Sequence, residues 1–430
     1  NMNSDVGRRI KQKRRQMGLT LKELAGNRVT AAQISAIENG KCNPSPKLLE
    51  YIAERLQVNI DYFTLTEEER CIKNFENFKK AAEELVKANK IDEAVEILNK
   101  SNAYSSCLTD EQKGYYFYIN GESLYIKKQY SAAFDFYVKS LTYYLKTTEN
   151  HMISDTYIKV GNCLFNSCEH LAALGYYISG YQYANDIEDF DAMARSLYNI
   201  SLCYLTDEKY KLAEEKAEEC LNLINTNSWE GSKRFLSGLE MISGAINHKK
   251  NEINEGYGKF KKAFLRYKEC DDKSGMGRAM NNIALCFLWN MNKLEDADRA
   301  FKEALKFKES CNDRTLADTY INYSEFLKEQ VDINKAFDNI LNAEEKMLQM
   351  NDKEGTLKIF IEKFKYTCEM GDFDKAEVYG FIALDYSQKL GNKKAEAEIY
   401  IKLSEMYKEA GDFELSVEYA LKARELATKD

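Results

Sequence analysis

The sequence of 430 residues contains only two prolines, Pro44 and Pro46, and none from Phe75 to its end. Proline breaks helices and marks turns, so its absence leaves room for long uninterrupted helices. The same stretch also has little of the β-branched alternation that strands require, and its apolar residues recur at helical spacing. We therefore expect an all-α fold.

Residues that carry chemistry are also scarce. The three histidines, His151, His170 and His248, are isolated, and the eleven cysteines form no CxxC motif and no Cys/His cluster with metal-ligand spacing. No nucleophile–base pair or phosphate loop is visible. We expect no enzyme activity, no metal site and no cofactor. We interpret the cysteines, including the closest pair, Cys163 and Cys168, as small buried hydrophobes in a reducing compartment.

Long apolar runs are missing as well. None reaches the length of about 18 residues that a membrane span needs, and no signal peptide precedes the first expected helix, so we expect a cytoplasmic protein without a membrane partner. Charge is divided unevenly, because residues 1–65 carry 11 Lys and Arg against 6 Asp and Glu, whereas the remainder carries 50 against 63. A basic head on an acidic body favours contact of the head with DNA.

Residues 20–40 have the pattern of two short helices joined by a tight turn. The apolar residues at helical spacing are Leu21, Leu24 and Ala25 in the first helix and Ile34 and Ile37 in the second. Gly26 and Asn27 break the pattern, Thr30 can cap the second helix, and Gly40 can end it. This is the pattern of a helix-turn-helix, whose second helix enters the DNA major groove.

The flanking sequence adds two helices to this pattern, within a head for which we expect five helices in all. A basic helix over residues 6–17 precedes the motif, and a further helix follows Ser45, with Pro46 at its first position. The inward-facing residues of the later helix are Leu48, Leu49, Ile52, Ala53 and Leu56. Residues 4–63 resemble the Cro/C1-type (XRE) DNA-binding domain, whose signature is present here as Ile37-Glu38-Asn39-Gly40-Lys41 and Asn43-Pro44-Ser45.

The resemblance implies roles for particular residues. In the family, a basic residue of the first helix pairs with the signature glutamate, which corresponds to Arg14 and Glu38; the alternative is that Arg14 contacts DNA phosphate. The positions that meet base edges match Thr30, Ala31, Ala32, Gln33 and Ala36, and the remaining expected DNA contacts are Thr20, Lys22, Arg28, Asn39, Lys41 and Asn43. Three alanines at the base edges leave hydrogen-bonded readout to Gln33 and Thr30.

The rest of the chain is a repeat array. One small residue recurs in each copy, at Ala94, Ala133, Ala173, Ala213, Gly256, Ala297, Ala336, Ala376 and Ser416, with spacings of 39 to 43 residues. This resembles the tetratricopeptide (TPR) repeat, although the period is near 40 rather than about 34. The resemblance implies about nine helix pairs in a right-handed superhelix. We expect a helix-turn-helix domain over 1–65, a helical linker over 66–74 that opens with a capping box at Thr66, and a repeat domain for peptide binding and dimerisation over 75–430.

One face of each first helix is expected to line the concave groove of the array. The residues at these positions are Lys159, Asn162, Asn166, Arg195, Asn199, Arg278, Asn282, Trp289, Asn322 and Glu325, where the numbering of the sixth repeat allows one extra turn residue before Ala297. Asparagine is a mediocre helix former, but its amide offers the donor and acceptor that an extended peptide backbone needs. The hypothesis is that these residues bind a peptide; the alternative is that asparagine belongs to the repeat consensus.

An XRE head followed by such repeats is similar to the RRNPP family of peptide-pheromone receptors. The resemblance implies a cytoplasmic transcriptional regulator that acts in quorum sensing, binds a pseudo-palindromic site on double-stranded DNA as a homodimer, and responds to a short signalling peptide. Two alternatives remain at this stage. One is an interaction protein whose repeats dock a response regulator or another signalling protein, and the other is a constitutive repressor that its repeats dimerise.

Overall fold

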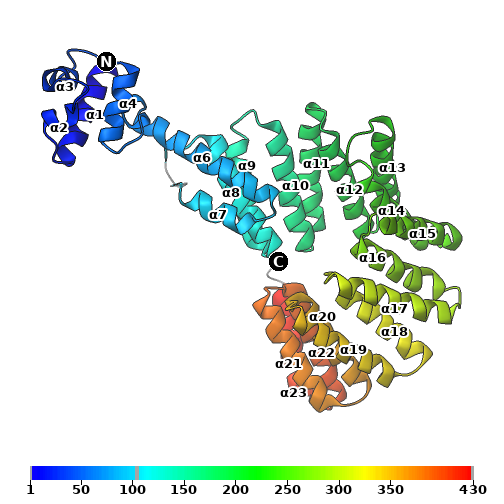
Figure 1. The fold of residues 1–430 in the computed structure, drawn as a ribbon. Helices are drawn as coiled ribbons and strands as arrows, with labels where there is room; N and C mark the ends of the chain where they lie inside the picture. Colours follow the sequence, from blue (N-terminus) through cyan, green and yellow to red (C-terminus); the bar gives the residue numbers. More distant parts are fainter. Residues whose placement is uncertain (1, 102–105, 428–430) are drawn as a thin grey trace. The chain divides into compact units, whose positions relative to one another are not determined.

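Every regular element that the structure describes is a helix, as the sequence predicts (Figure 1). The structure is a computed structural model that describes residues 2–101 and 106–427. The chain forms two compact units, residues 1–203 and 204–430. No helix among the described residues is long and apolar enough to cross a membrane.

The first five helices form the expected head. They are α1 (Met2–Gln16), α2 (Leu21–Ala25), α3 (Ala31–Glu38), α4 (Pro46–Arg55) and α5 (Asp61–Thr64). Ile10, Leu24, Ile34, Ile52 and Phe63 bring one core residue from each helix into a single cluster and are all at most 2 % exposed. Burial of this many large apolar side chains is the main stabilising term of so small a domain.

Side-chain caps set the helix boundaries in the head. Thr20 and Thr30 each accept a hydrogen bond from the third residue of the following helix, and that residue's side chain accepts one from the cap backbone, so both α2 and α3 begin with a capping box. Ser45 caps α4, which has proline at its first position. Gly40, with φ of 70°, takes the left-handed conformation that ends α3.

Nine helix pairs follow within the described residues (Figure 1). In chain order the elements are α6 (Glu67–Lys87), α7 (Ile91–Asn99), α8 (Asp110–Ile126), α9 (Tyr130–Tyr144), α10 (Asn150–Asn166), α11 (His170–Asp186), α12 (Phe190–Thr206), α13 (Tyr210–Thr226), α14 (Arg234–Lys249), α15 (Ile253–Glu269), α16 (Lys273–Ile283), η1 (Ala284–Leu288), α17 (Leu294–Ser310), α18 (Leu316–Gln330), α19 (Ile333–Gln349), α20 (Lys353–Glu369), α21 (Phe373–Lys389), α22 (Lys393–Glu409) and α23 (Phe413–Ala427). The expected linker, residues 66–74, forms the N-cap and first turns of α6, which continues as the first helix of the first pair.

Small residues allow the two helices of a pair to approach each other closely. All nine marker positions are buried, eight alanine or glycine and one serine. A second set of small residues lies on the first helices, where a Cβ at Gly121 would be 2.8 Å from the ring of Tyr137 and a Cβ at Gly161 would be 2.6 Å from the ring of Tyr177. These glycines let a tyrosine of the second helix pass over the backbone of the first.

The sixth pair departs from the regular pattern. The sequence analysis placed one extra residue in the turn before Ala297, and this placement is wrong. The extra residue is absorbed inside the first helix, where residues Ala284–Leu288 form the π-helical turn η1. A π turn takes up one residue more than an α turn, so the face of the helix shifts at this point.

The expectation that all cysteines are buried is also wrong. Cys163, Cys203 and Cys220 are buried, but Cys42, Cys168, Cys270 and Cys311 are exposed. The exposed ones lie at helix ends and turns rather than on inward-facing helix stripes. Cys168, for example, has φ of 64° and occupies the left-handed turn between α10 and α11.

Candidate functional sites

Arg14 and Glu38 form a buried ion pair between α1 and α3. Arg14 Nε donates to Glu38 Oε1 at 2.7 Å, Nη2 donates to Oε2 at 2.9 Å, and Nη1 donates to the carbonyl of Leu19 at 2.7 Å. The two residues are 9 % and 7 % exposed. The hydrogen bond to Glu38 raises the pKa of Arg14, so the guanidinium stays charged. The guanidinium of Arg14 thus contacts Glu38 and the Leu19 carbonyl, which is the arrangement that the structural interpretation expects.

The outer face of α3 is accessible, but its two best hydrogen-bonding side chains contact each other. Ala32 and Gln33 are exposed, and Ala31 and Ala36 are half-buried. Gln33 Oε1 accepts from the Thr30 backbone N–H at 3.1 Å, and Thr30 Oγ1 accepts from the Gln33 N–H at 3.2 Å. Gln33 can present its amide N–H₂ to a base without losing the cap, whereas its carbonyl is already engaged.

Several cations and amides surround this helix. Thr20, Lys22, Lys41 and Asn43 are exposed, and the guanidinium of Arg28 lies over the Tyr51 ring at 5.3 Å. Asn39 accepts a hydrogen bond from Lys11 Nζ at 3.3 Å. Lys11 is a candidate phosphate contact that the sequence analysis missed, because its proximity to the end of α3 depends on how α1 packs.

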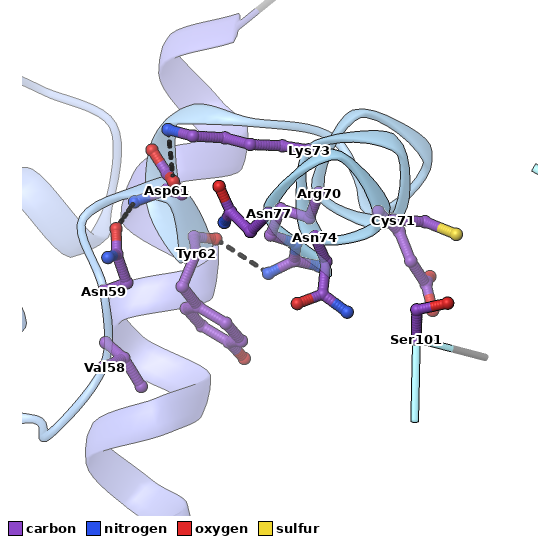
Figure 2. A pocket seen from close by; sticks show the side chains of 11 residues that line it. Val58, Asn59, Asp61, Tyr62, Arg70, Cys71, Lys73, Asn74, Asn77 and Ser101 are labelled. Atoms are coloured by element: carbon purple, nitrogen blue, oxygen red, sulfur yellow. Dashed lines mark hydrogen bonds and ion pairs between the residues drawn. The ribbon is translucent and has the colours of Figure 1, made fainter. Parts of the chain in front are cut away.

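The head is attached to α6 by more than the chain itself. Arg9 of α1 donates to the carbonyl of Tyr62 at 3.2 Å and to the carbonyl of Leu65, and Arg70 of α6 donates to the same Tyr62 carbonyl at 3.1 Å. The Lys73 ammonium pairs with Asp61 at 2.6 Å (Figure 2). These bonds agree with a short, stiff connection. They border a pocket of about 550 Å³, and Asn59, Asn74 and Asn77 are among the residues that line it.

The repeats of residues 1–203 contain three oxygen acceptors, each held between a tyrosine and the next first helix. Glu122 accepts from the Tyr137 hydroxyl and pairs with Lys159 at 2.7 Å. Asp155 accepts from the Tyr118 hydroxyl and pairs with Arg195 at 2.6 Å. Burial alone would raise the pKa of Asp155, but Arg195 and Lys159 outweigh it and hold the pKa below its usual value. The expected groove cations of this unit, Lys159 and Arg195, are therefore both paired with carboxylates.

The third acceptor is an asparagine. Asn162 Oδ1 accepts from the Tyr177 hydroxyl at 2.9 Å and from Asn199 Nδ2 at 3.2 Å. Asn166 Nδ2 donates to the Tyr125 hydroxyl at 3.0 Å and to the Asn162 carbonyl at 2.7 Å. The five candidate residues of this unit thus lie on α10 and α12. Lys159 and Arg195 pair with carboxylates, whereas the three asparagines are linked to one another and to Tyr125 and Tyr177.

The candidate residues of 204–430 form a looser set. Asn322 Nδ2 donates to Asn281 Oδ1 at 3.3 Å, and Asn281 in turn donates to Asn282 Oδ1 at 3.3 Å. Arg278 and Glu325 are exposed. The missed member is Asn281, which is 7 % exposed and links the two predicted asparagines.

Trp289 does not share the position expected for it. Its indole packs edge-on against Phe326, with ring centroids 5.5 Å apart, and it contacts the apolar core of this unit. The reason is η1, which lies between Asn282 and Trp289 and changes the helix phase between them. Among residues 2–101 and 106–427, no group of three or more His, Cys, Asp or Glu residues is arranged to hold a metal ion.

Comparison with known proteins agrees with this division of the chain. Residues 10–63 match the helix-turn-helix family. A search of curated proteins found no match. Among solved structures, the apo form of the quorum sensor NprR from B. thuringiensis is 17 % identical and has a TM-score of 0.52, covering 84 % of this chain and 100 % of its own. A Rap protein complexed with Competence and Sporulation Factor is 12 % identical and has a TM-score of 0.53, covering 84 % of this chain and 98 % of its own.

These likenesses concern the fold, because the identities are low. The family match identifies a helix-turn-helix head, and the matches to solved structures show that the helical repeat array has the fold of those in NprR and Rap. The chain therefore combines a helix-turn-helix head with a repeat array of the fold seen in NprR and this Rap protein.

Proposed function

We propose that this protein is a cytoplasmic DNA-binding transcriptional regulator that a short peptide controls by binding the inner face of its repeats. The DNA-binding part of this proposal rests on the exposed face of α3, a helix that the buried Arg14–Glu38 pair fixes to α1. A recognition helix must be held rigidly to place its side chains against base edges. The surrounding Lys22, Lys41 and Lys11 supply the positive charge that phosphates require.

The inner face of the repeats supports the second half. Its asparagines provide donors and acceptors at the surface of successive first helices, which suits the backbone of an extended peptide. The similar NprR is a quorum sensor, and the similar Rap protein is complexed with Competence and Sporulation Factor. A ligand-binding role for this face is therefore consistent with the fold.

A homodimer on a two-fold DNA site belongs to the same proposal. On α23, Phe413, Val417 and Leu421 are 66 %, 59 % and 51 % exposed, and their spacing of four residues places them on one stripe. An exposed apolar stripe at this position suits contact with the same stripe of a second copy.

The test uses two selections on the purified full chain. Duplexes selected from a random-sequence DNA library should share a two-fold motif. Native mass spectrometry against synthetic penta- to decapeptides should then find bound peptides, which are titrated against the selected duplex. Selection of no duplex, or duplex binding that survives removal of residues 1–65, would contradict the DNA-binding half. A peptide that binds without changing duplex affinity would contradict control by peptide.

The docking alternative is tested in the same preparation. The likeness of the array to a Rap protein extends over 84 % of this chain, so a protein partner is the second candidate ligand of the repeats. A response regulator retained by the full chain, with no peptide bound in the mass spectra, would favour that alternative.

A further inference from the structure

Tyr177 contacts a candidate groove residue, although it lies on the second helix of its pair and the groove residues lie on first helices. It lies on α11, is 1 % exposed, and crosses the backbone of α10 at Gly161. Its hydroxyl ends on Asn162 Oδ1 at 2.9 Å. Burial raises the pKa of Tyr177, so the hydroxyl keeps its proton and remains a donor.

This contact and one from Asn199 together occupy the side-chain oxygen of Asn162. A carbonyl oxygen has two lone pairs, and Asn162 Oδ1 accepts from both Tyr177 and Asn199. Among the described residues, Asn162 Nδ2 donates to no protein group and Asn199 Oδ1 accepts from none. The pair therefore offers a ligand one N–H₂ donor from Asn162 and one carbonyl acceptor from Asn199.

A single residue of an extended peptide offers the complementary groups. Its N–H and C=O point to the same side of the chain, as they do where one residue pairs with a neighbouring strand. We propose that Tyr177 is a positioning residue that fixes the polarity of the Asn162–Asn199 pair, which reads one peptide residue by its C=O at Asn162 and its N–H at Asn199. This inference rests on the proposed peptide-binding function.

The polarity also sets the direction of the ligand. Within one residue the N–H precedes the C=O along the chain, Asn199 lies on α12, and Asn162 lies on α10. The N-terminal side of the peptide is thus nearer α12 and the C-terminal side is nearer α10. The tyrosine one repeat earlier, Tyr137, crosses Gly121 in the same way but ends on a carboxylate, Glu122, so it sets no amide polarity.

The experiment uses the full chain and a synthetic mixture of random heptapeptides, from which affinity selection identifies a binding sequence. Each amide of that sequence is then replaced in turn by an ester. An ester at residue i removes the N–H of residue i, and an ester at residue i+1 weakens the C=O of residue i. We expect one adjacent pair of esters to weaken binding to the unmodified protein.

Variants assign each ester to an asparagine. Asn199→Ala should become insensitive to the ester at residue i, and Asn162→Ala to the ester at residue i+1. Tyr177→Phe should bind the peptide about threefold to tenfold more weakly, the effect of one hydrogen bond, and each ester should then couple to both asparagines because the Asn162 amide can turn over. Tyr116→Phe is the matched control, since Tyr116 is also 1 % exposed and its hydroxyl donates to an asparagine oxygen, Asn99 Oδ1, at 2.8 Å.

The outcomes are separable. If the esters couple in the opposite order, the polarity is wrong while peptide binding stands. If Tyr177→Phe behaves like Tyr116→Phe, with ester coupling unchanged, Tyr177 does not position the amide. If no heptapeptide binds the unmodified protein, both this inference and the peptide-binding function are overturned. Thermal melts of every variant show that affinity was compared between folded proteins.

Discussion

Replacing Arg14 by alanine should unfold the head locally. The substitution removes three hydrogen bonds of 2.7–2.9 Å, two of them to a carboxylate that is itself 7 % exposed. The loss of one partner of a buried pair costs about 3–5 kcal/mol, because the remaining charge has neither solvent nor a counter-ion. That is a large fraction of the roughly 5–15 kcal/mol that stabilises a typical domain.

The double variant Arg14→Met with Glu38→Leu separates the pair from the charge left behind. Apolar residues of similar size can replace a buried ion pair with little loss, so we expect the double variant to recover most of the stability. Recovery would show that the single variant is destabilised by unpaired Glu38 and not by the lost volume of Arg14. Glu38→Leu alone should destabilise the head in turn, since it leaves Arg14 unpaired.

The assay is amide hydrogen exchange measured by mass spectrometry on the full chain. Peptides from α1 and α3 report the opening free energy of the head, and peptides from α20 to α23 serve as an internal reference that should not change. If Arg14→Ala exchanges like the unmodified protein in α1 and α3, the pair does not stabilise the head. The reasoning from its geometry would then be refuted.

Further predictions concern charge, packing and assembly. Burial lowers the pKa of Lys308 from 10.5 to about 8, so the unfolded chain binds more protons than the folded one between these pH values. The unfolding free energy should therefore rise by about 3 kcal/mol from pH 8 to 10.5. Denaturant melts of Lys308→Met should lack this rise, and an equal rise in the variant would show that Lys308 is not its source. Lys41→Ala should lower the slope of log affinity against log salt for the selected duplex by about 1, and an unchanged slope would remove Lys41 from the phosphate contacts. Val417→Lys should shift the protein to monomer in analytical ultracentrifugation, whereas a persisting dimer would place the interface elsewhere. Gly161→Ala should destabilise the protein by about 1–3 kcal/mol in thermal melts, because its Cβ would lie 2.6 Å from a tyrosine ring; a smaller loss would mean that the ring moves aside.

The sequence predicted the architecture well because each level of pattern was local. Caps such as Thr30 and Thr66, the helical spacing of apolar residues and the recurring small residue all act within one helix or one pair. Patterns of this kind need no knowledge of distant packing. The pairing of Arg14 with Glu38, which are 24 positions apart, was instead implied by the resemblance to the XRE domain.

The sequence predicted less of the groove, because the hydrogen-bond partners of the groove residues lie on other helices. The sequence placed Asn199 and Asn322 on the inner face, but it did not show that each donates to an asparagine of the preceding first helix. Both side chains therefore link repeats as well as facing a ligand. Alanine at either position should therefore lower the unfolding free energy by about 1 kcal/mol per lost hydrogen bond.

The tyrosines were missed for a related reason. In the sequence, Tyr177 is one of 29 tyrosines, and its distance of 15 positions from Asn162 does not by itself show that the two side chains meet. The glycine beside Asn162 was the available clue, since Gly161 inside a helix needs a reason. A glycine that precedes a polar groove residue, as Gly121 precedes Glu122 in the neighbouring repeat, is a pattern that a search could use.

The π turn η1 has a genetic consequence. One inserted residue would ordinarily rotate every later residue of a first helix away from the helix face that it occupies in other repeats. Here the extra residue is taken up within Ala284–Leu288, and Ala297 of the second helix is buried as in the other pairs. Removal of one codon within that turn should restore an α-helix and the spacing of 40 residues that most other repeats have. The sixth repeat is thus a position where length variants of this gene can survive, and where such a variant would turn Trp289 and the residues around it without dismantling the array.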